Sequence, residues 1–385
     1  MIDINGVRGR AWAEISLDNI EHNYREIRKR VPRSAKICCV VKADAYGHGS
    51  VSVSKRLQIA GVDFFAVSNI DEALQLRESG ITASILILGY TPAERINDLA
   101  QNNISQCVYS YDYAMLLVQN AKQNNVKIPI HIKIDSGMGR LGFVFRHGEK
   151  DFDELIDVCS RDCFILEGIF THFPTADGGK NTESATRSQF ECFMAVIDEL
   201  ERRGKRFKFR HCANSAATLD YPEFSLDMVR VGIALYGTLP SQDMNTDITL
   251  KPTFTLKTVI SNIKCVKKGD TIGYGAEFVS KKDMKVAVLP IGYADGYRRI
   301  NYNNNTKVYL NGKACDIVGR VCMDQIMIDL GTESDANIGD EVVLFGEGAQ
   351  ISLWEFSKNN LTIPYEILCS ISDRVPRFYF GDNNC

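Results

Sequence analysis

The amino-acid sequence predicts an α/β fold in which an N-terminal (β/α)8 barrel is followed by a mostly antiparallel β C-terminal domain. Eight short apolar segments alternate with amphipathic segments up to about Gly237, the pattern of parallel strands joined by crossover helices. Eight parallel strands are the number that closes such a barrel. After about Leu250 the chain alternates Val, Ile and Thr with turn residues, which is typical of antiparallel strands.

A helix precedes the first strand of the predicted barrel. Ser16 or Asp18 is its expected N-cap, and Glu21 lies three residues beyond Asp18, as in a capping box. The eight predicted strands are 37–41, 64–67, 85–88, 106–109, 130–134, 168–170, 209–212 and 229–235. The segments between them predict ordinary helices, of which 70–80 ends at a glycine suited to a C-cap.

Each predicted strand ends in polar or chemically versatile residues. The residues at these ends are Lys42, Ser68, Tyr90, Ser110, Asp135, His172, Asn214 with Ser215, and Arg230 just inside the last strand. In a (β/α)8 barrel the carboxyl ends of the strands form the active site. We therefore expect the chemistry of this protein at these positions.

The predicted domains are a barrel over residues 11–245 and a β-rich domain over residues 246–385 together with residues 1–10. The polar segment 240–247 fits a linker. Within the second domain Asn311-Gly312 predicts a two-residue hairpin turn, because both residue types tolerate positive φ.

The composition disfavours several classes of protein. The chain has 45 Lys and Arg against 48 Asp and Glu, and this formal net charge of -3 gives no reason to expect nucleic acid or an anionic membrane as a partner. No segment has the length of apolar sequence that a membrane helix needs. The 12 cysteines show no metal-ligand or disulfide spacing, so we expect no metal, reduced thiols and a cytoplasmic protein.

The strongest local motif is the segment 40–49, in which an apolar strand delivers Lys42 into a loop of small residues and glycines. A lysine amine at a barrel mouth can form a Schiff base with an aldehyde, particularly if desolvation lowers its pKa. A lysine paired with a neighbouring carboxylate would also suit a strand end. The residues alone leave both interpretations open.

From Lys42 onward the sequence resembles the alanine racemase family. The matching segments are 42–49, 131–142, 171–173, 211–217, 229–233, 273–276, 291–297, 322–325 and 364–366. They extend over nearly the whole chain in the order and spacing of the family. The resemblance implies a (β/α)8 barrel followed by a β domain, with pyridoxal 5'-phosphate attached to Lys42 and bound by the hydroxyl groups of Tyr46 and Tyr365.

The phosphate of such a cofactor carries about two negative charges and needs hydrogen-bond donors. The expected donors follow strands seven and eight, where many barrel enzymes bind phosphate. They are Asn214, Ser215 and the backbone amides of Gly232 and Ile233. A helix N-cap is the alternative role of Asn214 and Ser215, and it needs the same groups exposed.

Arg230 lies in an otherwise apolar strand, where an unpaired charge is costly, so it needs a partner. The resemblance implies that it binds the pyridine nitrogen of the cofactor, which stays unprotonated because arginine can only donate. An unprotonated pyridine delocalises a carbanion less, which discourages transamination. His172 is expected beside the cofactor ring, although a histidine at a strand end can also be an ordinary satisfied polar residue.

Racemisation needs two proton-transfer groups on opposite faces of the substrate. By resemblance these are Lys42 and Tyr274, the latter from the second subunit of a homodimer whose active sites lie at the subunit interface. The ordinary pKa of tyrosine is about 10, so positive charge or hydrogen bonding should lower it. A strand aromatic packed beside a glycine turn is the alternative interpretation of Tyr274.

Three further residues complete the predicted site. Arg140, in the Gly-rich segment after the fifth strand, is expected to bind the substrate carboxylate or the cofactor phenolic oxygen. The resemblance implies that Lys133 can be carbamylated, which would convert a cation into an anion able to hold Arg140. It also implies that Met323 of the second subunit donates a backbone hydrogen bond to the substrate carboxylate.

The predicted function is the interconversion of L- and D-alanine by two bases, which supplies a D-amino acid for the cell wall. A serine racemase of the same family is the main alternative, because both side chains are small; Tyr365 and Tyr293 are expected to set the preference. A non-catalytic barrel that binds the same cofactor and a decarboxylase on a similar barrel are further alternatives. The segment 52–55 has the SxxK spacing of acyl-transfer serine enzymes, but their companion motifs are absent.

Overall fold

The computed structural model describes residues 9–146, 152–302 and 304–381. Contacts between Cα atoms divide the chain into two compact units. We call the first the barrel unit; it consists of Ile20–Ala45 and Ser50–Lys251. We call the second the β unit; it consists of the chain up to Asn19, Tyr46–Gly49 and the chain from Pro252 onward.

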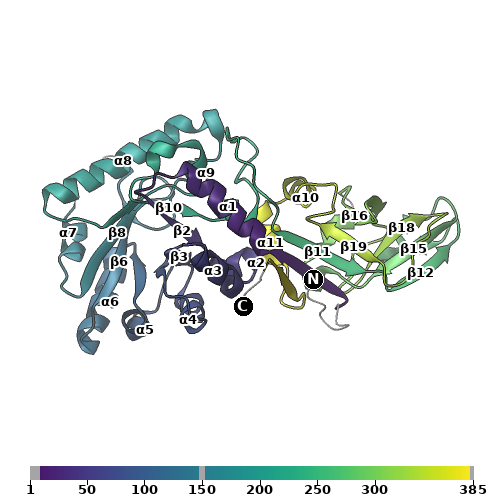
Figure 1. The fold of residues 1–385 in the computed structure, drawn as a ribbon, viewed down its shortest axis with the longest axis horizontal. Coiled ribbons are helices and arrows are strands. Elements are labelled where there is room, and N and C mark those ends of the chain that lie inside the picture. The colour runs from purple at the N-terminus through teal and green to yellow at the C-terminus, as the bar shows by residue number, and fades with distance from the viewer. Residues whose placement is uncertain (1–8, 147–151, 303, 382–385) are drawn as a thin grey trace. The chain divides into compact units, whose positions relative to one another are not determined.

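The barrel unit contains the predicted ring of eight parallel strands (Figure 1). In order around the ring the strands are β10 (Met228–Val231), β2 (Lys36–Val40), β3 (Phe64–Val67), β4 (Ser84–Ile87), β5 (Ile104–Val108), β6 (Ile128–Asp135), β8 (Phe164–Phe170) and β9 (Phe209–His211). A hydrogen bond of 2.9 Å from the Arg230 amide to the Ala213 carbonyl joins the two ends of this series. All eight predicted strands are therefore present. A short strand, β7 (Phe143–Val144), pairs with β6 outside the ring.

The eighth strand is shorter than the predicted segment 229–235. Strand β10 ends at Val231, because Gly232 leaves the extended conformation with φ −115° and ψ −99°. Ile233–Tyr236 then forms a 3-10 helix. Every residue of β3 and β10 is buried, since each strand meets the barrel interior on one face and helices on the other.

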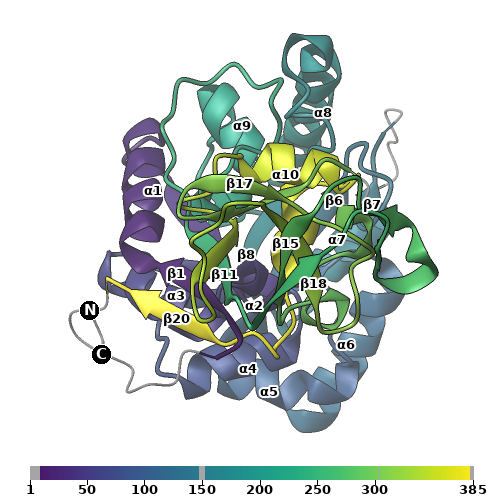
Figure 2. The same ribbon diagram turned by 90° about the vertical axis from the view of Figure 1, so that its right-hand side faces the viewer.

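Helices surround the barrel (Figure 2). They are α1 (Leu17–Arg30), α3 (Ser50–Ile59), α4 (Ile70–Glu78), α5 (Ile96–Gln101), α6 (Tyr111–Asn124), α7 (Asp153–Cys159), α8 (Glu183–Arg202) and α9 (Ser215–Asp220). The Ser16 hydroxyl caps α1 by accepting from the Asn19 amide at 3.2 Å, and Asn69 caps α4. Gly80, just beyond the end of α4, has φ +92°, as its predicted role requires.

The β unit is built from sheets. A six-stranded sheet has the order β17-β16-β19-β11-β1-β20, and a three-stranded sheet has the order β12-β15-β18. The bounds are β1 (Ala11–Ser16), β11 (Phe254–Val259), β12 (Asn262–Val266), β15 (Met284–Leu289), β16 (Lys307–Leu310), β17 (Lys313–Asp316), β18 (Ile326–Gly331), β19 (Glu341–Phe345) and β20 (Arg377–Phe380). Two short strands, β13 (Thr271–Ile272) and β14 (Phe278–Val279), and two helices, α10 (Leu353–Asn359) and α11 (Pro364–Ser370), complete the unit.

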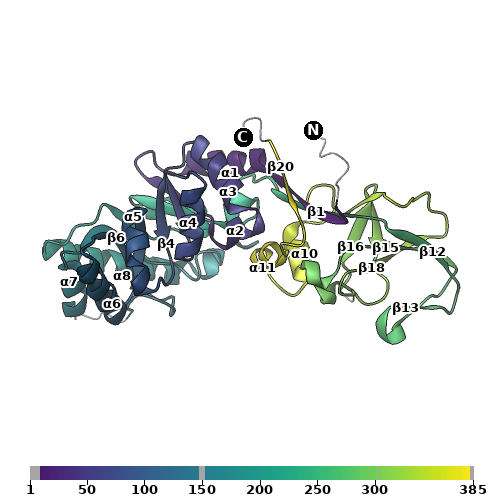
Figure 3. The ribbon, with the colours of Figure 1, turned by 90° about the horizontal axis from the view of Figure 1, so that it is seen from below.

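Two features of the β unit bear on the sequence predictions. Asn311 and Gly312 have φ +49° and +74°, so the turn between β16 and β17 has the predicted positive φ at both positions. The predicted barrel domain begins at residue 11, whereas the structure places residues 11–19 in the β unit. The reason is that β1 pairs antiparallel with β11 and parallel with β20, which Figure 3 shows beside it.

The described residues lack several kinds of feature. None of their cysteines forms a disulfide. They include no helix that is long and apolar enough to cross a lipid bilayer. Within the same residues no group of His, Cys, Asp and Glu side chains has the arrangement of a metal site.

Candidate active site

Lys42 begins α2 (Lys42–Gly47), which directly follows the first barrel strand and has an unusual backbone. The four residues after Lys42 have φ between +50° and +54°, and Gly47 follows with φ +78°. A left-handed conformation costs about 1–2 kcal/mol for each residue other than glycine, and it usually occurs at single positions. Four such residues in succession are strained, so the surrounding structure must hold them.

In the barrel unit two carboxylates hold this left-handed turn. The Glu72 side chain accepts hydrogen bonds from the Ala43 amide at 2.9 Å and from the Ser68 amide at 2.7 Å. The Asp44 carboxylate accepts from the Ser50 amide at 2.7 Å. Glu72 therefore connects the turn to the end of β3, the neighbouring barrel strand.

In the β unit a histidine and an arginine hold the end of the turn. His48 Nδ1 lies 3.1 Å from the Tyr46 carbonyl, and its Nε2 lies 2.8 Å from the Thr253 hydroxyl. Because a carbonyl only accepts, Nδ1 carries the proton and Nε2 accepts from Thr253. Arg377 Nε donates to the Gly47 carbonyl at 3.1 Å.

Positive charges gather around His172 at the carboxyl ends of the barrel strands. Burial lowers the pKa of His172 well below its usual value, and four nearby cationic side chains lower it further. These are Arg230, Lys133, Arg140 and Lys42. The predicted site residues of the barrel unit are thus brought together at this end of the ring, in an arrangement that suits an anionic ligand.

Lys133 points from β6 into this group. Its side chain is buried, its Nζ has no hydrogen-bond partner among the described residues, and it lies 4.8 Å from the centre of the Phe170 ring. Burial, with the charge of Arg230 next, lowers the pKa of Lys133 to about 7. A substantial fraction of this amine is therefore neutral and nucleophilic near neutral pH.

Arg230 is buried and forms no ion pair with a carboxylate of the described chain. Its Nη2 donates to the Thr171 carbonyl at 2.8 Å and lies 3.3 Å from His172 Nδ1, while its Nη1 lies 2.9 Å from His211 Nδ1. Burial lowers the pKa of Arg230 to about 10, so it stays charged at neutral pH. These contacts fix the guanidinium in one orientation.

Arg140 lies in a loop that Asp135 organises. The buried Asp135 carboxylate accepts from the amides of Gly137 and Gly139 at 2.9 to 3.1 Å and from Arg146 at 2.5 Å. Although burial raises the pKa of this carboxyl, these donors lower it overall. Gly142 has φ +129°, and a Cβ atom there would lie 2.5 Å from the Asp135 amide nitrogen. The loop therefore requires glycine where it returns to β6.

The predicted phosphate donors are close together after β9 and β10. The Ser215 hydroxyl accepts from the Gly232 amide at 2.9 Å, which places the start of α9 beside the start of the 3-10 helix at Ile233. The Asn214 side chain accepts from the Ala217 amide through Oδ1 at 3.0 Å and donates to the Phe173 carbonyl through Nδ2 at 3.0 Å. Asn214 thus has the N-cap role that the sequence left open.

The remaining predicted residues lie in the β unit. The rings of Tyr46 and Tyr365 are 5.9 Å apart, and burial raises the pKa of Tyr46. In contrast, Tyr274, at the start of a short 3-10 helix, and Met323 are 68% and 54% exposed. The amide of Tyr293, itself 43% exposed, donates to the Cys322 carbonyl at 3.1 Å and so lies beside Met323.

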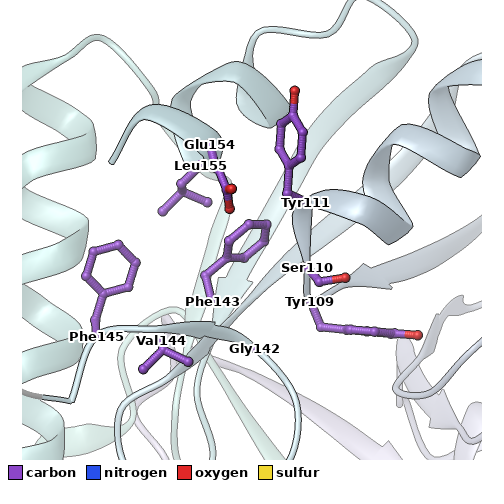
Figure 4. Close-up of a pocket in the computed structure, with 9 residues that line it drawn as sticks. All are labelled: Tyr109, Ser110, Tyr111, Gly142, Phe143, Val144, Phe145, Glu154 and Leu155. Carbon is purple, nitrogen blue, oxygen red and sulfur yellow. The ribbon is translucent and has the colours of Figure 1, made fainter. Parts of the chain in front are cut away.

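A separate cavity of about 430 Å³ lies next to β5 and β7 (Figure 4). Its lining residues are Tyr109, Ser110, Tyr111, Gly142, Phe143, Val144, Phe145, Glu154 and Leu155. Glu154 is the one charged residue among them. A phosphate would meet repulsion there, so this cavity does not fit the anionic ligand that the cations around His172 require.

The residues that support the site through hydrogen bonds were not recognised from the sequence. Glu72 lies on an ordinary amphipathic helix, and no local signal distinguishes it from an exposed glutamate. His131 and His211 belong to segments that matched the family, but neither was assigned a role. Glu167, which accepts from His131 Nε2 at 3.1 Å, belongs to no motif.

Models of known protein families match most of the chain. Residues 15–240 match the model described as alanine racemase, N-terminal domain. Residues 253–379 match the model described as alanine racemase, C-terminal domain.

Similar proteins share this length and fold. Alanine racemase 2 of Caldanaerobacter subterraneus subsp. tengcongensis is 44% identical over 369 residues, which are 95% of this chain and 94% of that protein. The structure of an alanine racemase of Clostridium difficile 630 has 42% identity and a TM-score of 0.92, covering 98% of this chain and 97% of that one. A structure described as the complex of this racemase with cycloserine has 41% identity and a TM-score of 0.90, with the same coverage.

We predict that replacing Glu72 with alanine destabilises the barrel unit, because the amides of Ala43 and Ser68 lose their acceptor. The expected loss is about 2 kcal/mol in free energy of unfolding, or about 5 °C in the thermal midpoint. Thermal unfolding followed by circular dichroism measures it. Glu78→Ala, at an exposed position of the same helix, is the matched control. Equal midpoints for the two variants would show that Glu72 does not hold the turn.

Proposed function

The chain belongs to the alanine racemase family and is a pyridoxal-phosphate-dependent racemase of alanine; we propose that Lys42 carries its cofactor and that Lys42 and Tyr274 are its two bases. The observation that carries this proposal is the group of cationic side chains around His172, which leads from Lys42 to Arg230 across the end of the barrel. The relatives named alanine racemase support alanine rather than serine as the substrate.

The residues of the barrel unit fit the cofactor. Its phosphate and phenolic oxygen are anionic, and the site offers buried positive charge, including the Lys133 amine that has no hydrogen-bond partner among the described residues. Ser215, with Gly232 and Ile233, would hold the phosphate beside Asn214, while Tyr46 and Tyr365 would add hydroxyl donors. Lys42, at the end of β2, would reach the aldehyde.

Arg230 would hold the pyridine nitrogen. Both terminal nitrogens of its guanidinium already bind Thr171, His172 and His211, which leaves Nε as a donor without a hydrogen-bond partner among the described residues. Because the group is charged at neutral pH and has no acceptor, it keeps the ring nitrogen unprotonated. His172 would lie beside the ring.

When bound, pyridoxal 5'-phosphate supplies an aldehyde that condenses with amines and a conjugated ring that acidifies the substrate Cα–H bond. Lys42 Nζ would move the α-proton on one face of the substrate. Tyr274 Oη would move a proton on the opposite face, so that removal on one side and return on the other inverts the centre. Arg140 and the Met323 amide would bind the substrate carboxylate and fix its orientation.

A second copy of the chain would supply Tyr274 and Met323. Both residues are more than half exposed, and neighbouring exposed apolar side chains can mark an interaction surface. The turn that bears Tyr274 packs against Arg320, two residues before Cys322, so the two exposed residues belong to adjoining segments of one surface. We therefore propose a homodimer in which each barrel mouth receives these residues from its partner.

Lys133 would carry a carbamate. Its pKa of about 7 leaves the neutral amine that carbon dioxide requires, and its Nζ lacks a hydrogen-bond partner among the described residues. The charges of Arg230 and Arg140 both lower the pKa of this amine, so a negative group in its place would be stabilised by the same two cations. The carbamate would hold Arg140 toward the substrate.

The physiological role follows from the product. D-Alanine made by this reaction would supply cell-wall synthesis. The free thiols of the described cysteines support a reducing compartment such as the cytoplasm.

We predict that Tyr274→Phe lowers kcat by about 10³-fold, because one of the two proton-transfer groups is lost. The variant should keep its cofactor, as its visible absorbance would show. The measurement is α-deuterium incorporation and loss of optical activity with L-alanine in deuterated buffer, with L-serine compared in parallel. Tyr302→Phe, in the same unit, should leave both rates unchanged. Racemisation by Tyr274→Phe at the unaltered rate would rule out Tyr274 as a base.

Mixing two inactive variants tests the shared site. In a dimer of Lys42→Ala with Tyr274→Phe, one site would combine the intact Lys42 of one chain with the intact Tyr274 of the other. Random exchange of subunits should then restore about one quarter of the activity of the unaltered protein. Mixtures in which both chains carry Lys42→Ala provide the control. No restored activity, with exchange shown by mass spectrometry, would mean that both bases come from one chain.

We also predict a carbamate signal in the ¹³C spectrum of protein incubated with ¹³C-bicarbonate. The signal should weaken as the pH falls below about 7, because the Lys133 amine then becomes protonated and no longer reacts. Lys133→Ala should lack the signal, whereas Lys264→Ala, at an exposed position, should retain it. A signal that persists in Lys133→Ala would place the modification elsewhere.

A further inference from the structure

We propose that Glu167 is a positioning residue for the reaction, which acts on Arg230 through a buried chain of hydrogen bonds formed by His211 and His131. The chain crosses the barrel interior from β10 through β9 and β6 to β8. The inference rests on the proposed role of Arg230, because its consequence for the reaction requires that Arg230 binds the cofactor.

The direction of every hydrogen bond in this chain is fixed. Arg230 Nη1 lies 2.9 Å from His211 Nδ1, and because a guanidinium only donates, this nitrogen must be the acceptor. A neutral imidazole then carries its proton on Nε2, which lies 2.8 Å from His131 Nδ1. His131 Nδ1 therefore accepts, and its Nε2 donates to Glu167 Oε2 at 3.1 Å.

Both histidines are neutral. They are fully buried, and burial lowers the pKa of each below its usual value. The nearby charge of Arg230 lowers both further, and although Glu167 raises the pKa of His131, burial outweighs this effect. Neutral rings give each histidine one donor and one acceptor, as the chain requires.

The barrel is shaped to hold these rings. His131 pairs with Gly168 across β6 and β8, at a point where the register of the two strands shifts. A Cβ atom at Gly168 would lie 2.3 Å from His131 Nδ1, so any other residue would displace the imidazole. The ring of His211 stacks on Phe170 at 4.8 Å with an interplanar angle of 6°.

Glu167 supplies the negative charge at the end of the chain. Burial raises the pKa of its carboxyl, but hydrogen bonds from His131 and from Ser105 lower it overall. The exposed Lys208 also lowers it. Glu167 is therefore ionised, and its side chain is 17% exposed. Glu167 is the carboxylate that the series of hydrogen bonds connects to Arg230.

This arrangement explains how a buried arginine stays charged while it remains able to act on the cofactor. A carboxylate in direct contact would neutralise Arg230, whereas no counter-charge at all would be costly. The series of hydrogen bonds places the Glu167 carboxylate two imidazole rings away from Arg230, and each hydrogen bond polarises the next. His211 Nδ1 thereby becomes a stronger acceptor, which holds the guanidinium in one orientation.

The experiment uses the holoenzyme and two kinds of readout. Two-bond ¹H–¹⁵N spectra of histidine-labelled protein report the tautomers, and His131→Phe assigns the His131 signals. We expect Nε2 to be protonated and Nδ1 bare in both His131 and His211. This readout does not depend on racemase activity, so it can fail or succeed independently of the proposed function. A proton on Nδ1 of either ring would overturn the proposal.

Glu167→Gln tests the charge, because its amide oxygen can still accept from His131. We expect kcat with alanine to fall about tenfold while KM stays within about twofold, since Glu167 does not touch the substrate. The visible absorbance of the bound cofactor should shift, and the tautomers should be retained. Glu199→Gln, which removes the charge of a glutamate on α8 that is 18% exposed and pairs with Arg203, should change none of these quantities. An unaltered kcat and absorbance in Glu167→Gln would reduce Glu167 to a structural residue and overturn the proposal.

Discussion

The structure depends on one electrostatic constraint: positive side chains are gathered at the mouth of the barrel without enough negative charge to balance them. Four cationic side chains lower the pKa of the His172 imidazole: Lys42, Lys133, Arg140 and Arg230. Two of these cations, Lys133 and Arg230, are buried, and buried cations are costly unless they are paired, so an anionic ligand would stabilise this end of the barrel. A phosphorylated cofactor and a substrate carboxylate meet that requirement together, which links the fold directly to the chemistry.

The strained loops around the site also help to gather positive side chains at the barrel mouth. The left-handed turn after Lys42 and the glycine-dependent loop that bears Arg140 are both held by buried or partly buried carboxylates, Glu72 and Asp135. The direct hydrogen bonds of these carboxylates go to backbone amides and Arg146 rather than to the cations of the site. The barrel thus separates the charges that hold its loops from the charges that bind its ligand, and Glu167 extends this separation through the barrel interior.

The sequence predicted the elements that depend on local pattern. The eight strands were recognisable because most of their residues are buried and apolar, and the turn at Asn311 was recognisable because it needs positive φ. The sequence could not reveal the left-handed turn, since Ala, Asp and Tyr ordinarily adopt right-handed or extended conformations. Nor could it assign β1 to the second unit, because the partners of an extended strand are not encoded in its own residues. The hydrogen-bond chain from Arg230 to Glu167 depends on strand register and on the space at Gly168, and neither can be inferred from spacing along the chain.

The resemblance to the racemase family predicted the site residues one by one, and the structure adds how those of the barrel unit are arranged. Arg230 is central to the proposed site, because its orientation, its charge and its inability to accept a proton would determine the state of the cofactor ring. The most direct test is the ¹⁵N chemical shift of the ring nitrogen in holoenzyme prepared with ¹⁵N-labelled pyridoxal 5'-phosphate. We expect an unprotonated pyridine between pH 6 and 9, whereas a protonated pyridinium in this range would rule out the proposed role of Arg230.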